Sequence, residues 1–232
     1  MREDLRDLYR TRFSESAETK KNGIWIEVCK HLNRYIDFRW LEYQGGLLVD
    51  VAAGYCDFVN NVSLPSNIRR VAFDANPDVA KWASENVEVI NDDISNIKKH
   101  FSEESASVIF MSNFLEHIDK VAIIKLFSDI WDILKFEGEL WILTPNIKYV
   151  GEKYWDFFDH ITPITEDSLI ELTESMGYRS KMVIRRFLPF TTKSRLPQWS
   201  WIVALYLKLM PVSGFFFGEQ SFLIFKKQKK GN

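Results

Sequence analysis

Short apolar runs alternate with helical segments through the middle of the chain, and this alternation limits the possible folds more than any other feature. Five runs have strand length and β-branched or aromatic content, and end in small or polar residues: 47–53, 70–75, 87–91, 106–111 and 139–143. The segments between them include 57–62, 77–86 and 118–136, which are predicted to be helices. This order indicates an α/β fold with a doubly wound parallel sheet, in which ligands bind at the carboxyl ends of the strands.

The two ends of the chain extend this core. Residues 1–44 have helical spacing of apolar positions, which predicts two helices that form an N-terminal lid. A further helix is expected from Thr165 to about Met176, ending at Gly177, and strands are expected at 181–187 and 221–227. Residues 188–217 form an aromatic-rich insertion. With 232 residues, the chain is expected to form a single domain over 1–232.

Charge and cysteine content exclude several classes of function. The formal net charge is −2, from 30 basic and 32 acidic residues, so no overall positive field would attract nucleic acid. Cys29 and Cys56 lack Cys or His neighbours at metal-ligand spacing, and no charged-then-apolar leader opens the chain. We therefore expect a cytoplasmic protein without a metal site or a required disulfide.

The stretch VDVAAGYCD, residues 49–57, has the form of a strand that turns into a helix. Gly54 would let the backbone of this turn approach a ligand closely. Asp74, twenty residues later, ends the second predicted strand, where a carboxylate can accept both hydroxyls of a ribose. Asp92 and Asp93 end the third strand, where they can read an adenine edge. The alternatives are a turn without a ligand, and Asp74 as a helix cap before Pro77.

Five segments in order resemble the motif series of class I S-adenosylmethionine-dependent methyltransferases: VDVAAGYCDF, VAFDANPD, VEVINDDI, VIFMSNFLEHI and GELWILTPN. The resemblance covers roughly residues 46–187. It implies a Rossmann-like, seven-stranded, mostly parallel sheet whose last strand, 221–227, lies antiparallel beside the fifth. It also implies S-adenosyl-L-methionine as the cofactor, and such enzymes generally need no metal.

The resemblance assigns cofactor contacts to ten residues. Asp50, Ala52 and Gly54 would lie against the methionine part, and Asp74 would hold the ribose diol. Ala75 and Asn76 would lie beside the adenine, Asp93 would accept from its amino group, and Ile94 would pack on its ring. Ser112 and Asn113 would line the pocket near the sulfonium.

Two residues depart from the family pattern. Ala52 and Cys56 stand where the family usually has glycine. Alanine tolerates the usual backbone region, so Ala52 is expected chiefly to narrow the pocket. Cys56 requires either a negative φ or a strained conformation that its surroundings stabilise. We favour a small buried side chain at Cys56 over a chemical role for its thiol.

Transfer of a methyl group to a hydroxyl requires a group that takes the proton, and histidine is suited to this near neutral pH. His31 and His100 are expected at the surface, and His117 follows the fourth strand, where a structural and a chemical role are equally open. His160 is the preferred base, with Asp159 or Asp156 orienting its ring. The aromatic residues of 154–158 would form a wall for a sugar or part of the core.

An arginine within residues 9–13 is a further candidate, either in a lid that meets the cofactor carboxylate or on a solvated helix face. The apolar segment within 195–217 would either rest on the inner face of a membrane or pack against protein, and we favour packing. It is too short to span a bilayer.

The FDHITPIT segment, residues 158–165, together with the insertion, resembles methyltransferases of bacterial surface-polysaccharide biosynthesis. That resemblance implies O-methylation of a sugar hydroxyl on a glycan or lipid-linked saccharide. A phenolic or quinone-type acceptor, a nicotinamide-dependent oxidoreductase and a non-catalytic cofactor-binding module remain the alternatives.

Overall fold

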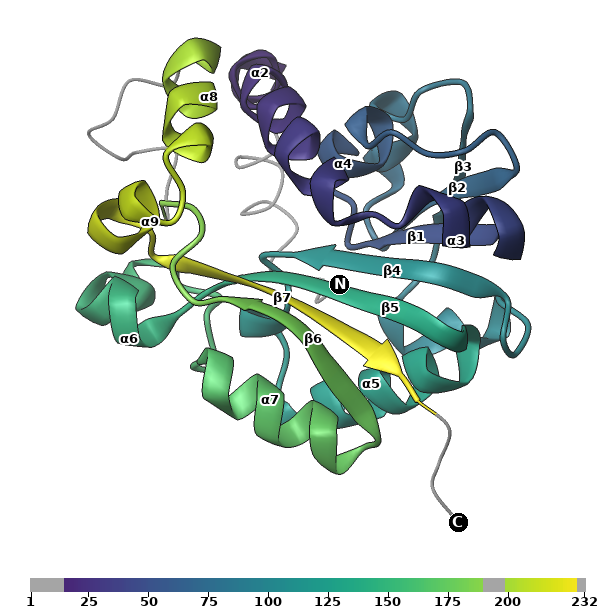
Figure 1. Cartoon of the computed structure of the whole chain (residues 1–232). Helices are drawn as coiled ribbons and strands as arrows, with labels where there is room; N and C mark the ends of the chain where they lie inside the picture. The colour runs from purple at the N-terminus through teal and green to yellow at the C-terminus, as the bar shows by residue number, and fades with distance from the viewer. Residues whose placement is uncertain (1–14, 190–198, 229–232) are drawn as a thin grey trace. The chain divides into compact units, whose positions relative to one another are not determined.

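A computed structural model describes residues 15–189 and 199–228 of the chain, and its strands form one seven-stranded sheet in the order β3-β2-β1-β4-β5-β7-β6 (Figure 1). The chain divides into two compact units. The first unit contains the described residues up to Ile94 and helix α8, and the second contains the others.

The first unit is built on three parallel strands: β1 (Gly46–Val51), β2 (Ile68–Asp74) and β3 (Val87–Asn91). Its helices are α2 (Glu15–Leu32), α3 (Phe38–Gln44), α4 (Asp57–Asn61) and α8 (Ser200–Lys208), with short 3-10 helices η2 (Asn33–Tyr35) and η3 (Pro77–Lys81). Helix α8 lies beside α2, although the two are far apart in the sequence (Figure 1). The apolar residues of β1 and β2, among them Val49 and Phe73, are buried as expected for a parallel sheet.

The segment 77–86 is not the helix that its sequence predicts. Only η3 is helical, and it ends at Lys81. The side chain of Asn60 explains this ending, because its Nδ2 donates to the carbonyl oxygen of Trp82 at 2.8 Å and its Oδ1 accepts from the backbone N–H of Ser84 at 3.0 Å. These backbone groups are therefore satisfied outside a helix.

The second unit contains β4 (Ala106–Ser112), β5 (Leu134–Pro145), β6 (Tyr178–Ile184) and β7 (Gln220–Lys227). Its helices are α5 (Lys120–Ile133), α6 (Ile147–Val150), α7 (Glu166–Ser175) and α9 (Val212–Phe217), with 3-10 helices η4 (Ile94–Lys99), η5 (Leu115–His117) and η6 (Gly151–Asp156). Helices α5 and α7 lie on the same face of these strands (Figure 1).

The antiparallel last strand is confirmed. Strand β7 runs antiparallel to both β5 and β6, and residues 222–225 are fully buried. A strand with apolar residues on both faces belongs inside a sheet rather than at its edge, which explains why the end of the chain returns between β5 and β6. The predicted mostly parallel, doubly wound α/β sheet is therefore correct.

Helix α7 (Glu166–Ser175) has the bounds predicted for the helix from Thr165 to about Met176, to within a residue. Thr165 caps α7 in a reciprocal capping box with Ser168. Gly177, at φ 98°, allows the chain to leave the helix and enter β6. The predicted insertion contains α8 and α9, whereas the arginines of residues 9–13 lie outside the described residues. Among the described helices, none is long and apolar enough to cross a membrane.

Candidate functional site

The turn after β1 has an unusual backbone. Ala52, Gly54 and Cys56 have φ values of 55°, 54° and 58°, in the left-handed region. The expectation that Ala52 would keep the usual backbone region is therefore wrong. The turn takes the shape that favours glycine at all three positions, and Ala52 and Cys56 adopt it with a Cβ, at a cost of about 1–2 kcal/mol each.

Hydrogen bonds and burial hold this strained turn in place. The N–H of Ala52 donates to the carbonyl oxygen of Phe73 at 2.8 Å, and the N–H of Cys56 donates to that of Ala53 at 2.8 Å. Cys56 is fully buried at the start of α4, and burial raises the pKa of its thiol. A protonated, buried thiol is a poor nucleophile, which supports the small-side-chain interpretation of Cys56.

Asp74 connects the end of β2 to this turn. Its Oδ2 accepts from the backbone N–H of Gly54 at 2.8 Å, and its Oδ1 accepts from that of Asn76 at 2.7 Å. Burial raises the pKa of the Asp74 carboxyl, and the two hydrogen bonds lower it in part. The alternative role as a helix cap is wrong, because Asn76 caps η3 by accepting from the N–H of Asp78.

Asp50 lies beneath the same turn, within β1. Its side chain is buried, and its Oδ2 accepts from the backbone N–H of Val59 at 3.2 Å, which fixes the start of α4 against the strand. Burial raises the pKa of Asp50 well above its ordinary value. The structure thus gives Asp50 an internal partner, and its predicted contact with a cofactor stays a prediction.

The remaining predicted cofactor residues follow the carboxyl ends of their strands. In the first unit, Ala75, Asn76, Asp93 and Ile94 are all half-buried. In the second unit, Ser112 ends β4, and Asn113 has a φ of 50° and donates from its side chain to Ser112 Oγ at 3.0 Å. In each unit these residues lie at or just after the carboxyl end of a strand, and their contacts with a cofactor stay a prediction.

The second unit brings four ionisable side chains together: Glu116, His117, Asp159 and His160. Nδ1 of His117 lies 3.0 Å from Asp159 Oδ2, and Nε2 of His117 lies 3.9 Å from Glu116 Oε1. The rings of His117 and His160 meet edge to face, with centroids 4.9 Å apart. Glu116, Asp159 and His160 are buried, whereas His117 is partly exposed.

Two loops create this cluster. Glu116 and His117 lie in η5 after β4, and Asp159 and His160 lie after η6. The loops are joined because the carbonyl oxygen of Glu116 accepts from the backbone N–H groups of Ile161 and Thr162, at 2.9 and 3.2 Å. The hydroxyl of Thr144, on β5, donates to Glu116 Oε2 at 3.3 Å.

Burial and charge act differently on the two neighbours Glu116 and His117. Burial raises the pKa of Glu116, although the charge of His117 offsets part of the rise. Burial alone would lower the pKa of His117, but its hydrogen bond with Asp159 and the charges of Glu116 and Asp159 outweigh burial and raise it. The cluster therefore favours a positive charge among its carboxylates.

Aromatic side chains surround His160 on its other sides. Its ring stacks on Phe157, with centroids 5.0 Å apart, and meets Tyr154 edge to face at 4.8 Å. Tyr154 is buried, whereas Trp155 and Phe158 are 52% and 85% exposed. The segment is thus divided: Tyr154 belongs to the core, and Trp155 and Phe158 are available to a ligand.

Several solved structures that are similar to this fold are S-adenosylmethionine-dependent methyltransferases. One from Archaeoglobus fulgidus is 19% identical, covers 86% of this chain and 93% of its own, and has a TM-score of 0.59. Another, from Thermotoga maritima, is 15% identical, covers 88% and 100%, and also has a TM-score of 0.59. The chain has the methyltransferase fold. No family model matches its sequence, and no curated protein does.

In this fold, the TPN segment at the end of β5 has a structural role. Asn146 is fully buried, and its Nδ2 donates to Glu166 Oε2 at 2.5 Å and to Ser221 Oγ at 2.8 Å. Its Oδ1 accepts from the N–H of Lys148 at 3.0 Å and caps α6. Asn146 thus ties β5 to α7 and β7, and so fixes the base of the loop that carries His160.

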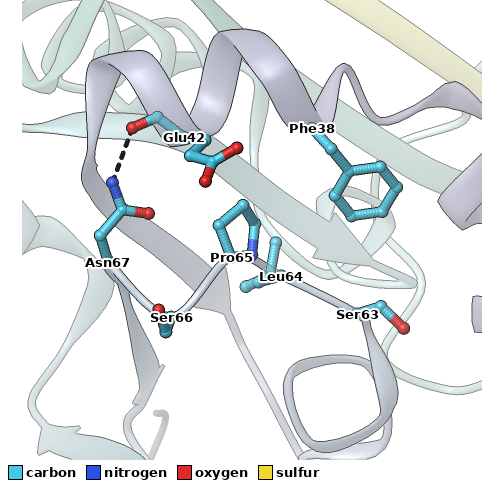
Figure 2. A pocket seen from close by; sticks show the side chains of 7 residues that line it. All are labelled: Phe38, Glu42, Ser63, Leu64, Pro65, Ser66 and Asn67. Carbon is cyan, nitrogen blue, oxygen red and sulfur yellow. Dashed lines mark hydrogen bonds between the residues drawn. The ribbon is translucent and has the colours of Figure 1, made fainter.

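An open hollow of about 530 Å³ in the first unit lies away from the turn. Figure 2 shows its lining, which includes Phe38, Glu42, Pro65 and Asn67, with the Asn67 amide donating to the carbonyl oxygen of Glu42 at 2.7 Å. These residues precede β1 and β2 in the sequence, so the hollow lies at the amino ends of the strands. The predicted cofactor residues lie at the carboxyl ends.

One sequence expectation about the histidines needs correction. His31 is buried rather than at the surface, and its Nε2 lies 3.2 Å from the hydroxyl of Tyr35, whereas His100 is exposed as expected. Asp159 contacts His117, and Asp156 is exposed; the predicted role of either carboxylate in orienting His160 stays a prediction. Glu116 was missed as a site residue, although its place beside His117 after a buried strand was a usable signal.

Proposed function

We propose that the protein is an S-adenosylmethionine-dependent methyltransferase. The observation that carries the proposal is the pairing of Asp74 with the turn of the first unit. Its carboxylate lies at the carboxyl end of β2 and is held by the N–H of Gly54. In a sheet of this type, a carboxylate at this position is suited to bind a ribose over the first turn.

The hydrogen-bond capacity of Asp74 leaves room for a ligand. An ionised carboxylate has about four lone-pair sites on its two oxygens. The N–H groups of Gly54 and Asn76 occupy one site on each oxygen. One lone pair on each oxygen can therefore accept a ribose hydroxyl, as the role of Asp74 requires.

We propose that the acceptor is bound by the second unit, beside the cluster of Glu116, His117, Asp159 and His160. The methyl group of the sulfonium is already activated, so the protein must chiefly align the acceptor and remove its proton. The sequence predicts that His160 is the base that removes this proton. The contact between Asp159 and His117 makes His117 a second candidate for this step.

A sugar hydroxyl is the acceptor that we propose. Trp155 and Phe158 expose aromatic faces close to the cluster in sequence, and such faces suit the apolar faces of sugar rings. A phenolic or quinone-type ring would use the same faces, so the acceptor class must be decided by experiment.

Helix α9 supports the finer proposal that the acceptor is linked to a lipid. Phe215, Phe216 and Phe217 are 66%, 66% and 51% exposed, and the guanidinium of Arg186 lies 5.7 Å from the Phe215 ring centroid. An exposed aromatic face beside a basic side chain is typical of contact with an anionic bilayer surface. Co-sedimentation with anionic vesicles should fall when Phe216 and Phe217 are replaced by Ser. Unchanged co-sedimentation would show that α9 does not contact the bilayer.

A screen with labelled methyl donor tests the proposed activity. The purified protein is incubated with the donor and with panels of saccharides, lipid-linked saccharides and phenols. Labelled saccharide is the expected product. Labelled phenol alone would overturn the sugar assignment, and cofactor binding without any labelled product would favour a binding module.

A further inference from the structure

We infer that Glu116, His117 and His160 form a binding site for a divalent transition-metal ion. The sequence predicts no metal site, because Cys29 and Cys56 lack Cys or His neighbours at metal-ligand spacing. In the structure, one ligand atom from each of the three lies within 4.8 Å of the others. Two imidazole nitrogens and a carboxylate oxygen form a known set of metal ligands with open positions.

The ring of His117 is held as a metal ligand would be. Its Nδ1 faces both the carboxylate and the backbone carbonyl oxygen of Asp159, at 3.0 and 3.3 Å. A proton on Nδ1 therefore has two acceptors, which leaves the lone pair of Nε2 directed toward the side of Glu116. Histidines that bind metals almost always donate their other N–H to a carboxylate or carbonyl group in this way.

The charge balance of the cluster also favours a cation. The side chains of Glu116 and Asp159 are 1% and 2% exposed, yet both carboxylates lie against the same imidazole. Buried carboxylates need a compensating charge. A divalent ion would balance both carboxylates while the two imidazoles stay neutral, which is the form in which they bind metals.

The ligand atoms must approach one another to hold an ion. Tetrahedral bonds of about 2.0–2.2 Å to Zn²⁺ place two ligand atoms about 3.3–3.6 Å apart. The three ligand atoms, which lie within 4.8 Å of one another, would close by up to about 1.5 Å through side-chain rotation. His117, which is 16% exposed, gives the ion a path to solvent and leaves space for a further ligand.

The nature of the ligands selects the class of ion. Mg²⁺ and Ca²⁺ prefer oxygen ligands, whereas imidazole suits Zn²⁺, Fe²⁺ and related ions. Three protein ligands leave at least one position open. An acceptor hydroxyl bound at that position would have its pKa lowered. In the metal-bound protein, His117 and His160 would therefore promote proton loss as ligands of the ion, in place of the role as a free base. This role rests on the proposed methyltransferase activity, but metal binding does not.

Metal binding is tested directly, without cofactor or acceptor. The metal-free protein is titrated calorimetrically with Zn²⁺, Mn²⁺ and Mg²⁺, and the absorption spectrum of its Co²⁺ complex is recorded. We expect one Zn²⁺ per chain, weaker or absent Mg²⁺ binding, and a Co²⁺ spectrum with nitrogen ligands. Saturable Zn²⁺ binding should disappear in Glu116→Gln, His117→Ala and His160→Ala.

Two further variants make the test specific. Asp159→Asn keeps the shape of the side chain and should weaken metal binding by about 10–100-fold, as expected for loss of a group that orients a ligand. His100→Ala, at an exposed histidine elsewhere in the second unit, should bind like the wild type. No binding by the wild-type protein, or equal binding by the His100 and His117 variants, would overturn the inference. If the wild-type protein binds Zn²⁺ but transfers no methyl group to any acceptor in the screen, the result would instead count against the proposed function.

Discussion

The two candidate sites are built in different ways. The turn of the first unit consists of backbone groups from one stretch of five residues, and a single carboxylate, Asp74, reaches it. The cluster of the second unit consists of side chains from two loops, with His117 and Asp159 separated by 42 residues. The turn, which uses backbone groups, is suited to bind the cofactor. The cluster, which uses ionisable side chains, is suited to bind the acceptor and to remove its proton. This contrast predicts that changes in the turn affect cofactor binding, and that changes in the cluster affect turnover.

The largest expected effect comes from His160→Ala. Turnover with the acceptor found by the labelled-methyl screen should fall by about 10²–10⁴-fold, the usual contribution of a group that handles the proton. Affinity for S-adenosylhomocysteine should change little, because the ribose is assigned to the first unit. Steady-state kinetics and calorimetry measure the two quantities separately, with His100→Ala as the control. Wild-type turnover in the His160 variant would show that His160 takes no part in proton removal.

For Asp74→Ala we expect the opposite result: weaker cofactor affinity with little change in turnover. Loss of hydrogen bonds to a charged group costs about 1.5–3 kcal/mol, which corresponds to a roughly 10- to 150-fold weaker affinity for S-adenosylhomocysteine. Turnover at saturating cofactor should be much less affected. Asp78→Ala is the matched control, since Asp78 is nearby, partly exposed and paired with Lys81. Equal affinities of the two variants would show that Asp74 only braces the turn.

Acidification should also act on the turn. Burial raises the pKa of Asp74, so this carboxylate takes up a proton at a higher pH than an ordinary aspartate does. Its ionised form accepts both ribose hydroxyls, so affinity should fall as the pH drops through the raised pKa, by up to about tenfold per pH unit. Calorimetric titrations across acidic pH should show this fall in the wild type and a flatter profile in Asp74→Asn. Parallel profiles would contradict the assignment.

The fold was predicted well because its signals are local. The apolar runs and the glycine at position 177 each act over a few residues, and the structure has the strands and the helix end that they predict, although β6 lies three residues earlier than the predicted 181–187. The turn was predicted in part: its position was correct, but φ at Ala52 depends on the contact with Phe73 in the next strand. Sequence spacing could not predict that contact.

The cluster was predicted less well because its contacts are not local. Asp159 is adjacent to His160 in the chain, yet it contacts His117, because the carbonyl oxygen of Glu116 joins the two loops. His31 shows the same limit, since the packing of α2 against other helices of the first unit buries it. That all 232 residues act as one methyltransferase domain stays a prediction.

The smallest effect is expected from relaxing the strained turn. Ala52→Gly removes a left-handed penalty of about 1–2 kcal/mol but adds freedom to the unfolded chain, so a net gain in stability of roughly 0.5–1 kcal/mol is expected. Ala53→Gly is the matched control, because the φ of Ala53 is not positive, and it should lose about 0.5–1 kcal/mol. Urea unfolding midpoints measure both. Equal losses in the two variants would show that Ala52 is not strained.

The most direct test of the central claim is calorimetric titration of the wild-type protein with S-adenosylhomocysteine and, separately, with NAD. A methyltransferase that holds its cofactor at Asp74 should bind S-adenosylhomocysteine at one site per chain and should not bind NAD measurably. Binding of NAD without binding of S-adenosylhomocysteine would contradict the account.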